Sequence, residues 1–184
     1  MANTTTAHTH DDHDHKPHGL KRWLYATNHK DIGTMYLVFA CVMFFLGGAM
    51  ALVIRAELFQ PGLQFVDPSF FNSMTTMHAL LMIFGAVMPA WTGLANWMVP
   101  MQIGAPDMAL PRLNNFSFWL LPFAFTLLLL TLFVPGGAPA GGWTLYPPLS
   151  LQAGDSFPLT IFAIHLMGIS SILGAINVVV TIMN

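Results

Sequence analysis

The sequence has few charged residues and almost no cysteine. Only 8% of its 184 residues are Asp, Glu, Lys or Arg, whereas a soluble domain usually has about 25%. With 55% hydrophobic residues and a mean hydropathy of +0.62, the composition predicts a membrane protein. The single cysteine, Cys41, excludes an internal disulfide. The net charge of −2 gives no indication of nucleic-acid binding.

The first 19 residues are polar and low in complexity, with five histidines between His8 and His18. This composition cannot form a packed core, so it predicts a disordered cytoplasmic tail. A metal-collecting tail is the alternative, but the histidines lack the spacing of a closed ligand set. We expect no cleavable signal peptide, because the first apolar run follows a polar segment too long and too acidic for one.

Four apolar runs predict an all-α membrane protein with four spans. The first is about 35 Å long at 1.5 Å per residue, which is enough to cross a hydrocarbon core of about 30 Å. Asn28 or Asp31 is predicted to cap its start. Glycines such as Gly47, Gly85 and Gly93 are predicted to let neighbouring helices approach closely. The predicted spans cover residues 32–54, 73–99, 116–134 and 159–183.

The distribution of Lys and Arg predicts the orientation in the membrane. Five of them fall in the N-terminal segment and in the loop between the second and third spans, and one falls on the opposite side. Because positive residues favour the cytoplasmic side, both ends of this chain are predicted to be cytoplasmic. The five are Lys16, Lys21, Arg22, Lys30 and Arg112, and the one is Arg55.

A long stretch without charge surrounds one histidine. No Asp, Glu, Lys or Arg occurs between Asp67 and Asp107, and His78 lies inside this run. An ionisable group within a membrane span is a candidate functional residue, because its burial in hydrocarbon is costly. His78 is a candidate ligand of haem iron, or it forms a hydrogen bond to a neighbouring helix. For His165, in the fourth span, we expect only a structural polar contact.

Asp107 follows the second span in a Gly-Ala-Pro-Asp loop on the predicted cytoplasmic side. It is a candidate entrance for protons, with Asn96, Asn114 and Asn115 holding water beyond it. The alternative is a helix-capping Asp beside turn-forming Asn residues.

The ends of the spans carry residues with simple interfacial explanations. Arg55 and Glu57 end the first span, where snorkelling to the interface explains both. Trp143 and Tyr146 are typical of an interfacial aromatic belt.

Six motifs together resemble one protein family. In order and spacing they are similar to subunit I of the haem–copper terminal oxidases, above all the bacterial aa3-type cytochrome c oxidases. The resemblance covers residues 20–184, and the fourth motif is the most specific. The motifs are TNHKDIG (27–33), IRAELFQPG (54–62), TMHALLMIF (76–84), GAPDMALPRLNNFSFW (104–119), GWTLYPPL (142–149) and HLMGISSILGAIN (165–177).

The resemblance implies a twelve-helix subunit of which this chain holds the first four helices. It implies reduction of O2 to water with electrons from cytochrome c, coupled to proton pumping across a bacterial inner membrane. Subunits II and III, cytochrome c and membrane lipid are the implied partners. High-spin haem a3 and the copper CuB belong to the complete subunit, and their ligands lie on later helices. The fragment is therefore not expected to be catalytic alone.

The resemblance also implies roles for individual residues. His78 matches one of two axial ligands of low-spin haem a, Arg55 the hydrogen-bond donor to its formyl group, and Trp143 a position near its propionates. The remaining matches are Asp107 as the entrance of the D proton pathway, Asn96, Asn114 and Asn115 as residues lining its mouth, and Glu57 and Gly62 as a peripheral sodium or calcium site.

Two other functions are compatible with the sequence. A ubiquinol oxidase of the same superfamily is the nearer one, although such oxidases carry Arg and Asp in the first span where Leu46 and Met50 stand here. The other is a non-catalytic four-span membrane module in which the histidines only pack.

Overall fold

The computed structural model describes residues 19–183, and every regular element in this part of the chain is helical. Four helical segments are long and apolar enough to cross a membrane. The predicted all-α fold with four spans is therefore confirmed, and the protein is a multi-pass membrane protein. The predicted disordered tail lies, except for Gly19, outside the described residues.

All four helical segments begin before the predicted spans; the first two also end later, the third ends earlier, and the fourth ends at the same residue. The second span is one continuous helical rod made of α3, η1 and α4, and the third ends at Leu130 because residues 131–133 form turns. The elements are α1 (Leu20–Leu24), α2 (His29–Glu57), α3 (Pro68–Leu80), the π-helix η1 (Leu81–Val87), α4 (Met88–Ile103), α5 (Pro111–Leu130), the 3-10 helix η2 (Leu149–Gln152) and α6 (Phe157–Met183).

The ends of the helices follow from local side-chain chemistry. The Asn28 side chain accepts a hydrogen bond of 2.8 Å from the Lys30 amide and so caps α2, as one of the two predictions had it. Asp31 instead accepts the guanidinium of Arg22 at 2.7 Å. Gly104, with a φ of 74°, ends α4 in the left-handed conformation that glycine adopts without strain.

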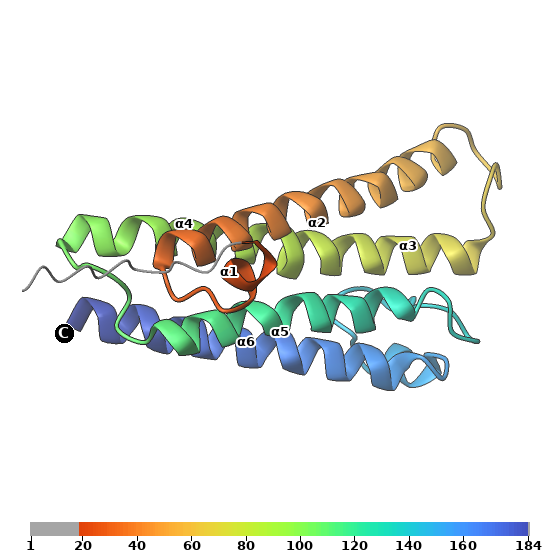
Figure 1. Ribbon diagram of the computed structural model, residues 1–184. Coiled ribbons are helices and arrows are strands. Elements are labelled where there is room, and N and C mark those ends of the chain that lie inside the picture. Colours follow the sequence, from red (N-terminus) through yellow and green to blue (C-terminus); the bar gives the residue numbers. More distant parts are fainter. Residues whose placement is uncertain (1–18, 184) are drawn as a thin grey trace, which may run out of the picture.

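The four spans run side by side (Figure 1), with α2 against α4 and η1, and α5 against α6. A Cβ atom on Gly93 would lie 3.0 Å from the Gly33 carbonyl oxygen, and one on Gly33 would lie 2.9 Å from the Gly93 oxygen. These distances leave no room for a side chain, so α2 and α4 pack backbone to backbone at this crossing. Gly93 was predicted from the sequence, and its partner Gly33 was not.

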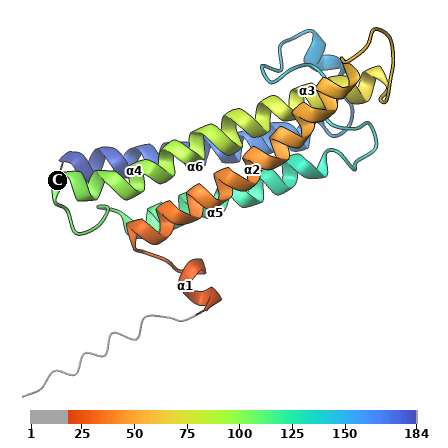
Figure 2. The same ribbon diagram turned by 90° about the horizontal axis from the view of Figure 1, so that it is seen from above.

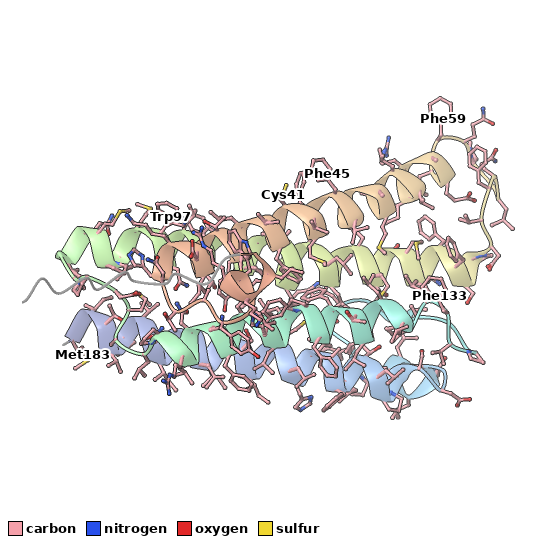
Figure 3. All side chains as sticks on the ribbon, viewed as in Figure 1. Cys41, Phe45, Phe59, Trp97, Phe133 and Met183 are labelled. Carbon is pink, nitrogen blue, oxygen red and sulfur yellow. The ribbon has the colours of Figure 1, made fainter. Side chains whose placement is uncertain are left out.

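The two ends of the bundle differ in their connections. The 104–110 loop and the C-terminal end of α6 lie at the same end as the start of α2 (Figure 2), while the loops 58–67 and 131–156 lie at the other. The outer side of the bundle is largely apolar: Cys41 and Phe45 project outward from α2 (Figure 3), and Phe45 is 69% exposed. Such a surface fits lipid or further helices better than water.

Candidate functional site

Asp107 lies in the 104–110 loop and is tied to the start of α2. Its Oδ1 accepts hydrogen bonds from the backbone amides of His29, at 3.0 Å, and Met108, at 2.7 Å. The buried His29 ring in turn donates from Nδ1 to the Asn96 carbonyl oxygen, at 2.8 Å, because a carbonyl can only accept. His29 thus joins Asp107 to α4, a role that its place in the sequence did not suggest.

Two of the three predicted asparagines meet in the bundle interior. Asn114 Nδ2 donates to Asn96 Oδ1, and Asn96 Nδ2 donates to the Thr92 carbonyl at 2.9 Å. Both asparagines are only 1% exposed. Buried amides of this kind are stabilised only when their polar atoms are paired.

The polar contacts continue from Asn114 into the interior of the helical bundle. Ser117 Oγ lies 2.7 Å from the Asn114 carbonyl and 2.9 Å from the Tyr36 hydroxyl. Ser170 Oγ donates to the Ser117 carbonyl at 2.6 Å. Side chains of α2, α5 and α6 therefore extend the polar line into the apolar core.

Asn115, the third predicted asparagine, is not part of this line. Its Nδ2 is buried and has no hydrogen-bond partner among the described residues, and the same is true of Asn177 Nδ2. Asn177 Oδ1 accepts the Leu110 amide at 2.9 Å, and Thr181 Oγ1 accepts the Ala109 amide at 3.0 Å. The end of α6 therefore holds the Asp107 loop. We call His29, Asn96, Asp107, Asn114 and Asn177 the Asp107 cluster.

His78 lies on α3, away from the Asp107 cluster and half-buried between α3 and α2. Its Nδ1 donates to the Gly47 carbonyl oxygen at 2.8 Å, so the lone pair is on Nε2. No described residue forms a hydrogen bond with Nε2. A histidine that binds a metal typically donates its other ring N–H to a carbonyl or carboxylate in this way.

The backbone around His78 is also unusual. A Cβ atom on Gly47 would lie 2.8 Å from Met82 Sδ, so a side chain at this position would require the Met82 side chain to move. The π-helix begins three residues after His78, and π-helical turns occur frequently at functional sites.

His165 contrasts with His78. It is exposed on the surface of α6, and its Nδ1 lies 2.7 Å from the Ile161 carbonyl of the same helix. The structural polar contact expected for His165 is thus found within its own helix.

Glu57 does not snorkel, so the interfacial explanation of this residue is wrong. It is 5% exposed, and its carboxylate accepts the amides of Gln64 at 2.8 Å, Phe65 at 2.7 Å and Val66 at 3.1 Å. Gly62, with a φ of 91°, lies in the loop that folds back onto this carboxylate. Arg55, two residues earlier, is exposed.

Trp143 follows a loop that packs on the helix carrying His78. Its ring centroid lies 6.4 Å from that of Phe84 in η1, and the Gly142 amide donates to Thr76 Oγ1 at 2.9 Å. We call Gly47, Arg55, His78 and Trp143 the His78 region. Within residues 19–183, no group of three or more His, Cys, Asp or Glu side chains is arranged to hold a metal ion.

Comparison with known proteins identifies the family. The family model described as cytochrome c and quinol oxidase polypeptide I matches residues 31–184. Cytochrome c oxidase subunit 1 of Candida albicans (strain SC5314 / ATCC MYA-2876) is 47% identical over 171 residues, which are 90% of this chain and 32% of that protein. The chain thus spans about a third of the length of this curated relative. The predicted resemblance is confirmed, and the chain belongs to the family of cytochrome c and quinol oxidase polypeptide I.

Proposed function

We propose that the chain is the N-terminal part of subunit I of a proton-pumping cytochrome c oxidase, which reduces O2 to water with electrons from cytochrome c. The observation that carries this proposal is the geometry of His78 in a chain of this family. Its Nδ1 is bonded to the Gly47 carbonyl, and its Nε2 lone pair is available in an apolar region. A neutral imidazole oriented in this way fits an axial ligand of haem iron.

In this proposal His78 would hold the iron of low-spin haem a. The other ligands of this haem, and those of haem a3 and CuB, would come from parts of the subunit beyond this chain. When bound, the haem supplies one-electron redox chemistry. The contribution of this chain is to fix the imidazole: the Gly47 carbonyl sets its tautomer and direction, and the close approach of α2 to η1 keeps that carbonyl in place.

Arg55 and Trp143 complete the proposed haem surroundings. Arg55 lies eight residues along α2 from Gly47, about 12 Å at 1.5 Å per residue. It is assigned as donor to the haem a formyl group, which its long and exposed side chain allows. Trp143 is assigned to the propionate region, on the loop that packs against α3.

The Asp107 cluster is proposed as the entrance of the D pathway. Asp107 is the only carboxylate in this cluster, so it is the group that takes up a proton. Asn96 and Asn114 line the way inward, and Asn115, which follows Asn114 on α5 but is not bonded to the cluster, is proposed to line it as well. Their amides do not titrate, so the proton moves along water held by them. The buried and unpartnered Nδ2 of Asn115 supports this assignment, since such donors are usually satisfied by water.

Glu57 and Gly62 are proposed as part of a peripheral sodium or calcium site. The three backbone amides that point at Glu57 use three of its roughly four lone-pair directions. A cation would therefore need further oxygen ligands from the 58–67 loop or from other parts of the oxidase.

The assembly and orientation are proposals of the same kind. Subunits II and III, cytochrome c and lipid are the proposed partners, in a bacterial inner membrane. The excess of Lys and Arg at the Asp107 end favours a cytoplasmic position for both ends of this chain.

A ubiquinol oxidase is the second candidate, because the matching family includes quinol oxidases. The apolar residues Leu46 and Met50 favour cytochrome c as the electron donor. A reduced-minus-oxidised visible spectrum of material purified through a tag on this chain separates the candidates. A haem a band supports the cytochrome c oxidase, a haem b band alone indicates the quinol branch, and no band contradicts both and favours a non-catalytic module.

A further inference from the structure

The loop before Trp143 is held by three hydrogen bonds to other parts of the chain, although its sequence suggests a flexible segment. Residues 136–142 read Gly-Gly-Ala-Pro-Ala-Gly-Gly, and glycine-rich segments usually behave as flexible linkers. Here Ser73 Oγ donates to the Ala138 carbonyl at 2.8 Å, Thr76 Oγ1 accepts the Gly142 amide at 2.9 Å, and Ser156 Oγ donates to the Gly137 carbonyl. The first two contacts come from α3, the helix that carries His78.

Thr76 forms the contact nearest to Trp143. Its side chain is 1% exposed and makes two hydrogen bonds, one from the Gly142 amide and one to the Asn72 carbonyl at 3.0 Å. Gly142 has a φ of 85°, which favours glycine, and it directly precedes Trp143. The direction in which the chain reaches Trp143 is therefore set at the Thr76–Gly142 bond.

We propose that Ser73 and Thr76 are positioning residues that hold Trp143 at a fixed place relative to His78. Thr76 and His78 are two residues apart on α3. The same helix therefore carries the imidazole and holds the loop that carries the indole. The inference rests on the proposed function only in that His78 and Trp143 serve the same haem. The hydrogen bonds that carry it are independent of that assignment.

The test compares three variants of the complete oxidase. Thr76→Val keeps the shape of the side chain but removes the acceptor for the Gly142 amide. Thr76→Ser restores it. Thr75→Val is the matched control, because Thr75 is exposed and bonds only to the Phe71 carbonyl of its own helix. Amide hydrogen exchange of the segment with Gly142 and Trp143 is measured, together with the low-spin haem band and the rate of turnover.

For Thr76→Val we expect about tenfold faster exchange at Gly142, as the loss of one hydrogen bond allows, together with a shifted haem band and slower turnover. Thr76→Ser restores all three, and Thr75→Val changes none. Equal exchange in Thr76→Val and Thr75→Val, with a normal haem spectrum, would show that the Thr76–Gly142 hydrogen bond does not hold the loop. It would overturn this inference and leave the proposed function standing. Faster exchange with an unchanged band and rate would overturn the positioning role. A parent oxidase without a haem a band would instead remove the proposed function, and the positioning role with it.

Discussion

The Asp107 cluster and the His78 region differ in how far their bonding is completed within these four helices. In the Asp107 cluster, side chains and backbone of α2, α4, α5 and α6 bond to one another, and Asn96 and Asn114 are almost fully buried. In the His78 region, His78 has one hydrogen bond, Arg55 is exposed and Trp143 is 47% exposed.

The two regions differ because polar groups in an apolar bundle need partners nearby, whereas a pocket for a cofactor needs several surrounding elements. Most donors and acceptors of a polar cluster in an apolar bundle must be paired, so the Asp107 cluster forms where the helices that supply them meet, with Asn177 Nδ2 as the donor left without a partner among the described residues. The haem pocket proposed around His78 needs walls on several sides, and this chain spans about a third of the length of its curated relative. We therefore expect the Asp107 cluster to tolerate isosteric changes structurally, and the His78 region to depend on a partner group.

The strongest test of this comparison is removal of the proposed iron ligand. In the complete oxidase, His78→Leu replaces the imidazole by an apolar side chain of similar size that cannot ligate iron. We expect loss of the low-spin haem a band and of turnover, measured by visible spectroscopy and oxygen uptake. His165→Leu is the control, because His165 is exposed and bonds to its own helix. Retention of the band in His78→Leu would contradict the assignment.

Asp107→Asn tests the other region. Asparagine keeps an oxygen that can accept the His29 and Met108 amides, so the cluster should stay folded and the haem spectrum unchanged. Without a titratable group we expect no proton pumping and turnover slower by about 100-fold, in the range for loss of a positioned proton-transfer group. Asp67→Asn is the control, since asparagine caps α3 as well as aspartate does. Full pumping in Asp107→Asn would rule out the proposed entrance.

The sequence predicted the features that depend on local chemistry or on composition. Four apolar runs were sufficient to count the spans, and the place of Asn28 before the first run indicated its cap. Asn96 and Asn114 were singled out as residues that could hold water beyond Asp107, and the structure brings them into contact.

Features that depend on packing between distant segments were missed. His29 and Asp107 are 78 residues apart, and Leu110 and Asn177 are 67 apart. Their contacts arise only when α2, α6 and the 104–110 loop meet at one end of the bundle. The π-helix after His78 has no local sequence signal, and Asn177 was not singled out among the residues of the fourth span. A search for every intramembrane amide would have included Asn177.

Glu57 was misread for a related reason. Its place at the end of the first span suggested a free interfacial carboxylate, but the loop seven to nine residues later folds back and donates three amides to it. This carboxylate lies at the end of the bundle opposite to the Asp107 cluster, and it is nevertheless satisfied within the chain.

Glu57→Gln tests whether the carboxylate holds the 58–67 loop at the end of the bundle opposite to the Asp107 cluster. The three amides bond to both carboxylate oxygens of Glu57. Glutamine has only one acceptor oxygen, and its NH2 group would face an amide donor. We expect the 58–67 loop to lose about 1–3 kcal/mol of local stability, the usual effect of leaving buried groups unpaired, measured by amide exchange of residues 64–66. Asp155→Asn, at an exposed carboxylate, should leave that exchange unchanged. Equal protection in Glu57→Gln would mean that the loop holds itself without the carboxylate.

Arg55→Met has the smallest expected effect and tests how incomplete the His78 region is. Because Arg55 is exposed, its removal should leave the four-helix packing as it is, so any spectral change must come from contact with a group outside this chain. Loss of a hydrogen-bond donor to the formyl reduces electron withdrawal from the haem, and we expect the low-spin haem band to move to shorter wavelength while both haems remain bound. Arg112→Met, which removes an exposed arginine at the opposite end, should leave the band in place. An unchanged spectrum in Arg55→Met would restrict this arginine to the membrane interface and leave His78 as the one tested contact to the haem.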